Sequence, residues 1–148
     1  MGFSEAVRTV LKQKYATFSG RASRSEYWWY YLFYCLVLFA FGIVAVGIAA
    51  AAGGENGFSS LAIGVMVIAG LFVLATILPA LAVQVRRFHD RNISGWWYLA
   101  LVILGLVPYV GLIASIAIFV ISVLPGTVGP NKFGPDPLRP EVRAEVFA

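Results

Sequence analysis

The stretch Arg86-Arg87-Phe88-His89-Asp90-Arg91-Asn92-Ile93-Ser94-Gly95-Trp96-Trp97 is where charge interrupts the apolar part of this sequence. It holds three arginines, an aspartate and the chain's one histidine, and it ends in two tryptophans. The sequence on either side is apolar enough for lipid, whereas this stretch is not. Basic residues beside tryptophan are typical of a membrane protein that turns at a water interface.

Composition predicts an all-α membrane protein. Of 148 residues, 60% are hydrophobic and 12% are charged, against about 45–50% and about 25% in soluble domains. Three ranges carry no charged side chain, namely 27–54, 56–85 and 92–131. Because an apolar run of about 18 residues or more indicates a transmembrane helix, we expect one polytopic membrane domain over residues 1–148.

The net charge of +4 does not indicate nucleic acid as a partner. The basic residues flank apolar segments, where they set topology and meet anionic lipid headgroups. Cys35 lies inside an apolar run, so we expect a packed small side chain. The apolar run that begins at Tyr27 exceeds the roughly 7–15 residues of a signal sequence, so we expect no cleavable signal peptide.

Residues 3–18 are predicted to form a short amphipathic helix. Its apolar side chains recur at helical spacing, and they are Phe3, Val7, Val10, Leu11, Tyr15 and Phe18. Basic residues lie off this stripe. Such a helix suits the plane of a membrane surface, and it equally suits packing on the protein's own loops.

The first transmembrane helix is predicted over residues 24–52. Gly20 can end the preceding segment in the left-handed conformation. Ser23 and Glu26 match a capping box, in which the serine hydroxyl accepts from the Glu26 amide and the carboxylate reaches back to the Ser23 amide. Aromatic residues from Tyr27 onward then form a belt at headgroup level.

A second transmembrane helix is predicted over residues 59–87. Pro79 should kink it and free the carbonyl of Ala75, and Thr76 can bond a freed carbonyl. Residues 96–124 form either one helix kinked at Pro108 or a hairpin of two short helices, 96–107 and 111–124. The Pro/Gly-rich tail, 125–148, is expected to be a surface loop.

Charge counting orients the chain. Five Lys/Arg precede residue 27 and three lie in 86–91, whereas the 53–58 loop has none. By the positive-inside rule, the N-terminus and the 86–91 stretch are predicted to be cytoplasmic. If the tail is also cytoplasmic, the number of crossings is even, which favours the hairpin.

Three blocks of sequence together resemble a known family. They are Gly-Arg-Ala-Ser-Arg-Ser-Glu-Tyr-Trp at 20–28, the Arg-Arg-Phe-His-Asp and Ser-Gly-Trp-Trp elements of 86–97, and Gly-Pro-Asn-Lys-Phe-Gly-Pro-Asp-Pro at 129–137. Their order and spacing are similar to those of the bacterial inner-membrane proteins of the domain-of-unknown-function 805 family, over about Leu11 to Pro137. The chain departs from the family pattern at Phe88, where Leu is usual, and at Arg91-Asn92, where a small pair such as Thr-Gly is usual. The resemblance implies a small polytopic inner-membrane protein and no particular activity.

The candidate site is a group of basic and aromatic residues at the predicted cytoplasmic interface. Its lipid- or anion-binding candidates are Arg21, Arg24, Arg86, Arg87, Arg91, Trp28, Trp96 and Trp97. Guanidinium groups fit phosphate, and basic pockets between helices hold anionic headgroups. The alternative is structural: the arginines anchor topology, and Glu26 and Asp90 pair with two of them. Arg86 and Asp90 have the i, i+4 spacing of a helical ion pair.

We expect neither a metal, a cofactor nor a catalytic residue. His89 and Asp90 alone fall short of a zinc site, which takes three or four protein ligands. With Ser23, Glu26 and Gly95 they are assigned a structural role. The preferred function is a non-enzymatic accessory protein that binds anionic lipid or a membrane-protein partner at its cytoplasmic face. The alternatives are a small oligomeric transporter or channel, suggested by the breaks at Pro79 and Pro108, and a lipid-modifying enzyme.

Overall fold

The computed structural model describes residues 1–51 and 60–139 of the chain. Within them the elements are α1 (Phe3–Arg8), the π-helix η1 (Thr9–Gln13), α2 (Arg24–Ala51), α3 (Ser60–Asp90), α4 (Gly95–Leu104) and α5 (Val110–Val123). All secondary-structure elements of the described residues are therefore helices, as expected. α2 and α3 are long and apolar enough to cross a membrane.

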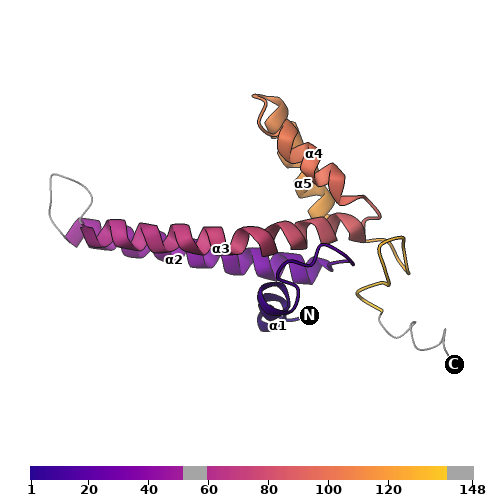
Figure 1. Ribbon diagram of the computed structural model, residues 1–148, viewed down its shortest axis with the longest axis horizontal. Helices are drawn as coiled ribbons and strands as arrows, with labels where there is room; N and C mark the ends of the chain where they lie inside the picture. The colour runs from indigo at the N-terminus through magenta and orange to yellow at the C-terminus, as the bar shows by residue number, and fades with distance from the viewer. Residues whose placement is uncertain (52–59, 140–148) are drawn as a thin grey trace.

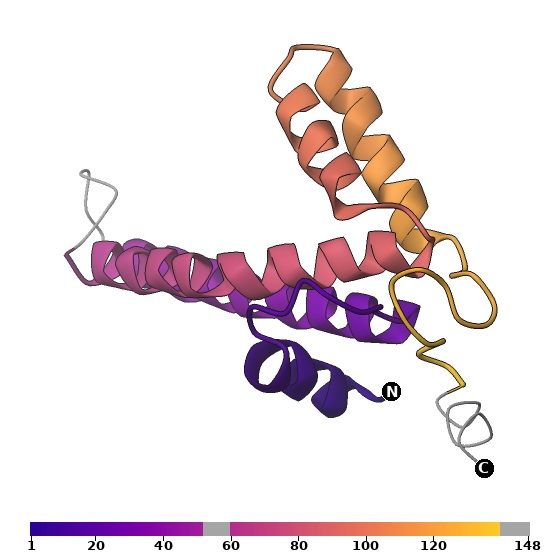
Figure 2. The same cartoon turned by 45° about the vertical axis from the view of Figure 1, so that its right-hand side comes forward.

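Two helical hairpins diverge from one end of the molecule (Figures 1 and 2). α2 and α3 lie antiparallel along their whole length, and α4 and α5 form a shorter pair that leaves the end of α3 at a steep angle. α1 packs beside the first turns of α2, and the tail loops around the end of α3. We call the place where α2 begins and α3 ends the charged end.

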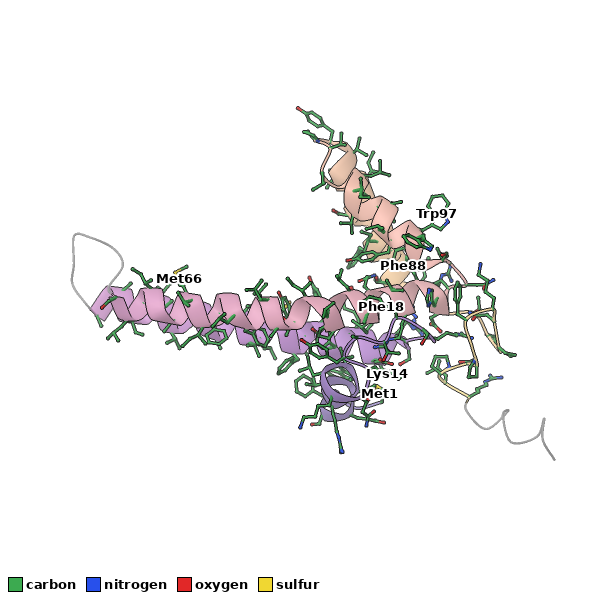
Figure 3. All side chains as sticks on the ribbon, in the orientation of Figure 1. Met1, Lys14, Phe18, Met66, Phe88 and Trp97 are labelled. Carbon is green, nitrogen blue, oxygen red and sulfur yellow. The ribbon has the colours of Figure 1, made fainter. Side chains whose placement is uncertain are left out.

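Side-chain packing is concentrated near the charged end. The buried core cluster consists of Val10, Ala22, Tyr27, Tyr30 and Val83. Farther along α2 and α3 the large apolar side chains point outward (Figure 3). Hydrocarbon tails are as apolar as these side chains, so this exposure is stable in a membrane.

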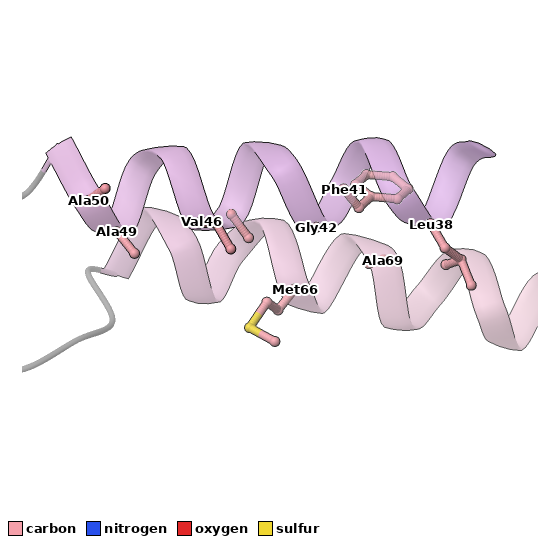
Figure 4. A pocket seen from close by; sticks show the side chains of 9 residues that line it. Leu38, Phe41, Gly42, Val46, Ala49, Ala50, Met66 and Ala69 are labelled. Atoms are coloured by element: carbon pink, nitrogen blue, oxygen red, sulfur yellow. The ribbon is translucent and has the colours of Figure 1, made fainter. Parts of the chain in front are cut away.

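Small residues let α2 and α3 meet in their apolar half. Ala45 and Ala62 are buried there, as close helix contact in lipid requires. Beside them lies an open groove of about 590 Å³ between residues 38–50 of α2 and the Met66 and Ala69 side chains of α3 (Figure 4). All of its lining residues are apolar.

The N-terminal helix is shorter than predicted. It ends at Gln13 rather than residue 18, and its second half is a π-helix. Of the predicted stripe only Val10 is buried, together with Ala6 and Thr9, whereas Phe3, Tyr15 and Phe18 are exposed. Phe3 packs edge-on against Trp29, with 5.9 Å between ring centroids. The helix therefore packs on the protein itself, against α2.

The quoted stretch is helical for longer than predicted. α3 continues to Asp90, so residues 86–90 form its last turn, and the chain reverses only at 91–94. Asn92 takes the left-handed conformation, with φ of 60°. The predicted boundaries at 52 and 59 lie outside the described residues.

Residues 95–123 form a hairpin rather than one kinked helix. Gly111 lies against Gly105 so closely that an added Cβ would come within 2.5 Å of the Gly105 carbonyl oxygen. Gln84 of α3 donates to the buried Ser122 hydroxyl of α5 at 3.0 Å, and Arg87 donates to the Leu124 carbonyl. The hairpin therefore begins and ends at the charged end.

Pro79 lies inside α3, and the carbonyl it frees is bonded by a residue we did not predict. Ala75 O accepts from the Tyr15 hydroxyl, which reaches across from the N-terminal segment. Thr76 instead donates to Phe72 O at 2.7 Å. The assignment of Thr76 to the freed carbonyl was wrong, because its hydroxyl reaches only the preceding turn of its own helix.

Candidate functional site

The charged end contains a buried layer of five ionised side chains. Arg21 comes from the loop before α2, Glu26 from the first turn of α2, and Arg86, Arg87 and Asp90 from the last turn of α3. Each is at most 5% exposed. Burying charge is costly unless the charges are paired and hydrogen-bonded, so the partners of each group decide whether the layer is stable.

Arg87 joins two other segments to α3. Its guanidinium pairs with Asp90 Oδ2 and donates to the Ala22 carbonyl at 3.3 Å and the Ser122 carbonyl at 3.0 Å. A further bond goes to Leu124 O. The planar guanidinium carries five N–H donors, so one side chain connects α3, the segment before α2 and the end of α5.

Arg21 forms a second ion pair with Asp90 and donates hydrogen bonds to the tail. Its Nε donates to Asp90 Oδ1 at 2.9 Å, and its Nη atoms donate to Thr127 O at 2.5 Å and Gly129 O at 2.6 Å. The Asp90 carboxylate thus lies between two guanidinium groups. The chain is so close here that a Cβ on Gly126 would fall 2.0 Å from Asp90 Oδ2.

Arg86 pairs with Glu26 across the α2–α3 contact. The predicted i, i+4 pair of Arg86 with Asp90 was wrong, because Arg87 takes Asp90 at i, i+3 spacing. The Ser23 cap is confirmed for one bond, from the Glu26 amide to Ser23 Oγ at 3.2 Å. The Glu26 carboxylate pairs with Arg86 rather than the Ser23 amide. The Nε and Nη2 atoms of Arg86 are buried without a hydrogen-bond partner in the described chain.

His89 has a structural position beside this layer. Its Nδ1 lies 3.1 Å from Gly20 O, where Gly20 has φ of 82° as predicted, and its ring stacks on Phe133 with centroids 3.9 Å apart. A Cβ on Gly95 would come within 3.4 Å of His89 Nε2. Among residues 1–51 and 60–139, no cluster of three or more metal-ligating side chains accompanies His89 and Asp90.

The predicted anion-binding residues do not share one surface. Arg21, Arg86 and Arg87 are inside, whereas Arg24 is exposed. Trp28 is half-buried, with its ring 5.9 Å from that of Phe119. The other candidates form the outer rim: Trp96 and Trp97 are exposed, and Arg91, half-exposed, donates to Pro125 O at 2.6 Å.

The sequence did not predict that the tail forms hydrogen bonds to the last turn of α3. Thr127 donates its amide to Asp90 O at 2.8 Å, and the Asn131 side chain donates to His89 O at 2.9 Å. Asp136 accepts from the Leu138 amide at 2.9 Å and the Gly129 amide at 3.1 Å. The bond from Leu138, followed by that from Gly129, holds the pKa of Asp136 below its ordinary value. Asn and Asp among Gly and Pro are a signal for such side-chain-to-backbone turns.

A cavity of about 330 Å³ opens between the tail and the start of α2. Its polar lining comes from Arg21, Arg24, Ser25, Asp90, Thr127 and Asp136. The rest of the lining is Pro125, Gly126, Val128 and Leu138. This cavity is therefore lined partly by charged and polar side chains, whereas the groove between α2 and α3 is lined by apolar residues alone.

The known proteins whose sequences are similar to this chain are bacterial inner membrane proteins. The Escherichia coli K12 inner membrane protein YhaH is 37% identical over 128 residues, which cover 86% of this chain and 92% of that protein. Inner membrane protein YhaI of the same strain is 37% identical over 129 residues, covering 87% and 92%. No solved structure matches the chain. A family described as "Protein of unknown function (DUF805)" matches residues 15–135, which include the buried charged layer and the first part of the tail. The protein therefore belongs to the DUF805 family of inner-membrane proteins.

Proposed function

We propose that this is a non-enzymatic accessory protein of the inner membrane that binds anionic phospholipid with its charged end, on the cytoplasmic side. One observation carries the proposal: the buried arginines have internal partners, while five other basic residues of the described chain are exposed around the same end. These exposed residues are Arg8, Lys12, Arg24, Lys132 and Arg139. A basic surface near the headgroups attracts anionic lipid, by about 1 kcal/mol per Lys or Arg.

The lengths of the helices support a charged end that lies wholly on one side of the membrane, and the positive-inside rule makes that side the cytoplasmic one. α2 and α3 would cross the membrane, since 28 and 31 residues reach roughly 42 Å and 46 Å. The arms of the second hairpin, with 10 and 14 residues, reach only about 15 Å and 21 Å. That is short of the roughly 30 Å hydrocarbon core. The second hairpin would dip into the membrane and return, which leaves the N-terminal segment and the tail on one side.

Cysteine labelling in intact cells tests this topology. In a Cys35→Ser background we expect Ser60→Cys to react with a membrane-impermeant reagent from outside, and Lys132→Cys to react only after lysis. Tyr109→Cys, at the tip of the second hairpin, should resist the reagent from both sides. Reaction of Lys132→Cys in intact cells would overturn the orientation, and reaction of Tyr109→Cys from outside would make the second hairpin a full crossing.

Lipid binding is tested with purified protein in nanodiscs of phosphatidylethanolamine with or without phosphatidylglycerol. Native mass spectrometry of the released protein should show retained phosphatidylglycerol above its share of the bilayer. The charge-removing variant Arg8→Gln/Lys12→Gln should reduce that enrichment, whereas the charge-preserving Arg8→Lys/Lys12→Arg should retain it. Equal retention of both lipids by the native protein would sink the proposal, and so would turnover of either lipid during the incubation.

A further inference from the structure

The 330 Å³ cavity at the start of α2 has a fixed cation on its inner wall. Arg21 is 5% exposed, and its three bonds to Asp90, Thr127 and Gly129 leave its guanidinium no freedom to turn. The wall is therefore organised before any ligand arrives, which lowers the entropy lost on binding.

A second cation lies at the mouth of the cavity. Arg24 is exposed, and in residues 1–51 and 60–139 its side chain forms no ion pair and no hydrogen bond. It is the first residue of α2, next to Ser25, which also lines the cavity. The positive end of the helix dipole thus reinforces the charge of Arg24.

The carboxylates of the cavity do not cancel this charge. Asp90 is shared by Arg21 and Arg87, and Asp136 accepts from two backbone amides. Among the groups that line the cavity or pair with its walls, three guanidinium groups (Arg21, Arg24, Arg87) face two carboxylates. One positive charge remains, and it is located at Arg24.

Apolar side chains border the polar cavity. Val128 is 80% exposed and Leu138 is 71% exposed, and both line it. Exposed apolar groups beside a cationic cavity favour an amphiphile over a fully hydrated ion, because the amphiphile's glycerol and acyl atoms can cover them.

We propose that this cavity is a phospholipid headgroup site, in which Arg24, backed by Arg21 and the start of α2, binds the phosphate. Val128 and Leu138 contact the glycerol backbone and the first acyl carbons. The inference rests on the proposed lipid-binding function and makes it specific: besides the lipid attracted by the basic surface, one lipid is held at a defined place.

The test compares two single-charge variants, Arg24→Gln at the cavity mouth and Lys14→Gln as a half-exposed control outside its lining. Bound phosphatidylglycerol is measured by native mass spectrometry after release from nanodiscs. We expect Arg24→Gln to weaken retention of one lipid by at least about tenfold, since a charge-assisted hydrogen bond to phosphate is lost. Arg24→Lys should restore part of that retention, and Lys14→Gln should change it by less than about twofold.

A second experiment, with a water-soluble ligand, tests whether the site binds a phospholipid or a free phosphate ester. Glycerol 3-phosphate, titrated by isothermal calorimetry, should bind far more weakly than the lipid. Val128→Asn/Leu138→Asn should weaken lipid retention without changing glycerol 3-phosphate binding. If the soluble ester binds as tightly as the lipid, the lipid assignment is wrong.

The result can also separate this site from the general proposal. If Arg24→Gln and Lys14→Gln reduce retention equally, lipid binding is a property of the whole basic surface and the cavity site is refuted. If the native protein shows no preference for anionic lipid at all, the proposed function fails with it.

Discussion

Arg86 of α3 and Glu26 of α2 form an ion pair that is shielded from solvent, with both side chains at most 2% exposed. The pair joins the last turn of one long helix to the first turn of the other, and it lies beside the Arg21–Asp90–Arg87 group. Since two nitrogen atoms of Arg86, Nε and Nη2, already lack a partner in the described chain, Glu26 is the group that makes burial of Arg86 tolerable.

Removing one member of this pair should therefore cost more than removing both. We expect Glu26→Gln to lower the free energy of unfolding by about 3–5 kcal/mol, because a buried guanidinium loses its counter-charge. Glu26→Met/Arg86→Met should cost less than Glu26→Gln, since no buried charge is then left unpaired. Unfolding in mixed micelles measures both, with the exposed Glu5→Gln as control. A double variant less stable than Glu26→Gln would contradict this account.

The bond from Tyr15 to the Ala75 carbonyl predicts a coupling between two distant residues. Tyr15→Phe should cost about 0.5–1.5 kcal/mol of unfolding free energy in the native background. In a Pro79→Ala background the restored amide can bond Ala75 O within the helix, so the same replacement should cost much less. A double-mutant cycle measures this difference. Equal costs in the two backgrounds would show that Tyr15 does not serve the carbonyl freed by Pro79.

Gly126 should not tolerate a larger residue. A Cβ there would overlap the Asp90 carboxylate at 2.0 Å, and this carboxylate is held in place by Arg21 and Arg87. We expect Gly126→Ala to cost about 1–3 kcal/mol and to make the tail more sensitive to limited proteolysis. Gly47→Ala, in open space on α2, is the matched control and should stay within about 0.5 kcal/mol. Unchanged proteolysis in Gly126→Ala would mean that the tail does not lie against Asp90.

The tail should loosen in acid through Asp136. Its pKa is below the ordinary value of 3.8 because the Leu138 amide, followed by the Gly129 amide, donates to the carboxylate. A depressed pKa in the folded state contributes stability that is complete above the unfolded value and is lost as the pH falls through the folded value.

The measurement is the thermal midpoint of the native protein and of Asp136→Asn across this pH range. At neutral pH Asp136→Asn should be the less stable protein, and the difference should shrink as the native carboxyl protonates below its ordinary range. A difference that is independent of pH would show that the Asp136 charge does not hold the tail.

Much of the fold could be predicted because lipid simplifies the problem. The uncharged ranges 27–54 and 56–85 indicated the two long helices by composition alone, and the Ser23 cap and the left-handed Gly20 followed from local backbone chemistry. The hairpin over 95–123 could be offered only as one of two alternatives, because Pro108 is compatible with a kink and with a turn.

The site was predictable as a set of residues but not as an arrangement. Residue spacing suggested that Arg86 would pair with Asp90, whereas the antiparallel contact of α2 and α3 brings Glu26 to Arg86 and leaves Asp90 to Arg21 and Arg87. No spacing rule could assign Tyr15 to Ala75, or Thr127 to Asp90, since these partners meet only after the N-terminal segment and the tail have packed on α3.

By itself, the sequence determined that the chain lies in a membrane, where its long helices run and which end carries its charge. Those features depend on hydropathy and local backbone propensity, which act over a few neighbouring residues. Only the tertiary structure decided which arginines are buried and which face outward, because a guanidinium is neutralised by carboxylates and carbonyls that are distant in the chain. Within residues 1–51 and 60–139, that arrangement leaves the Arg24 side chain without an ion-pair partner at the mouth of the cavity.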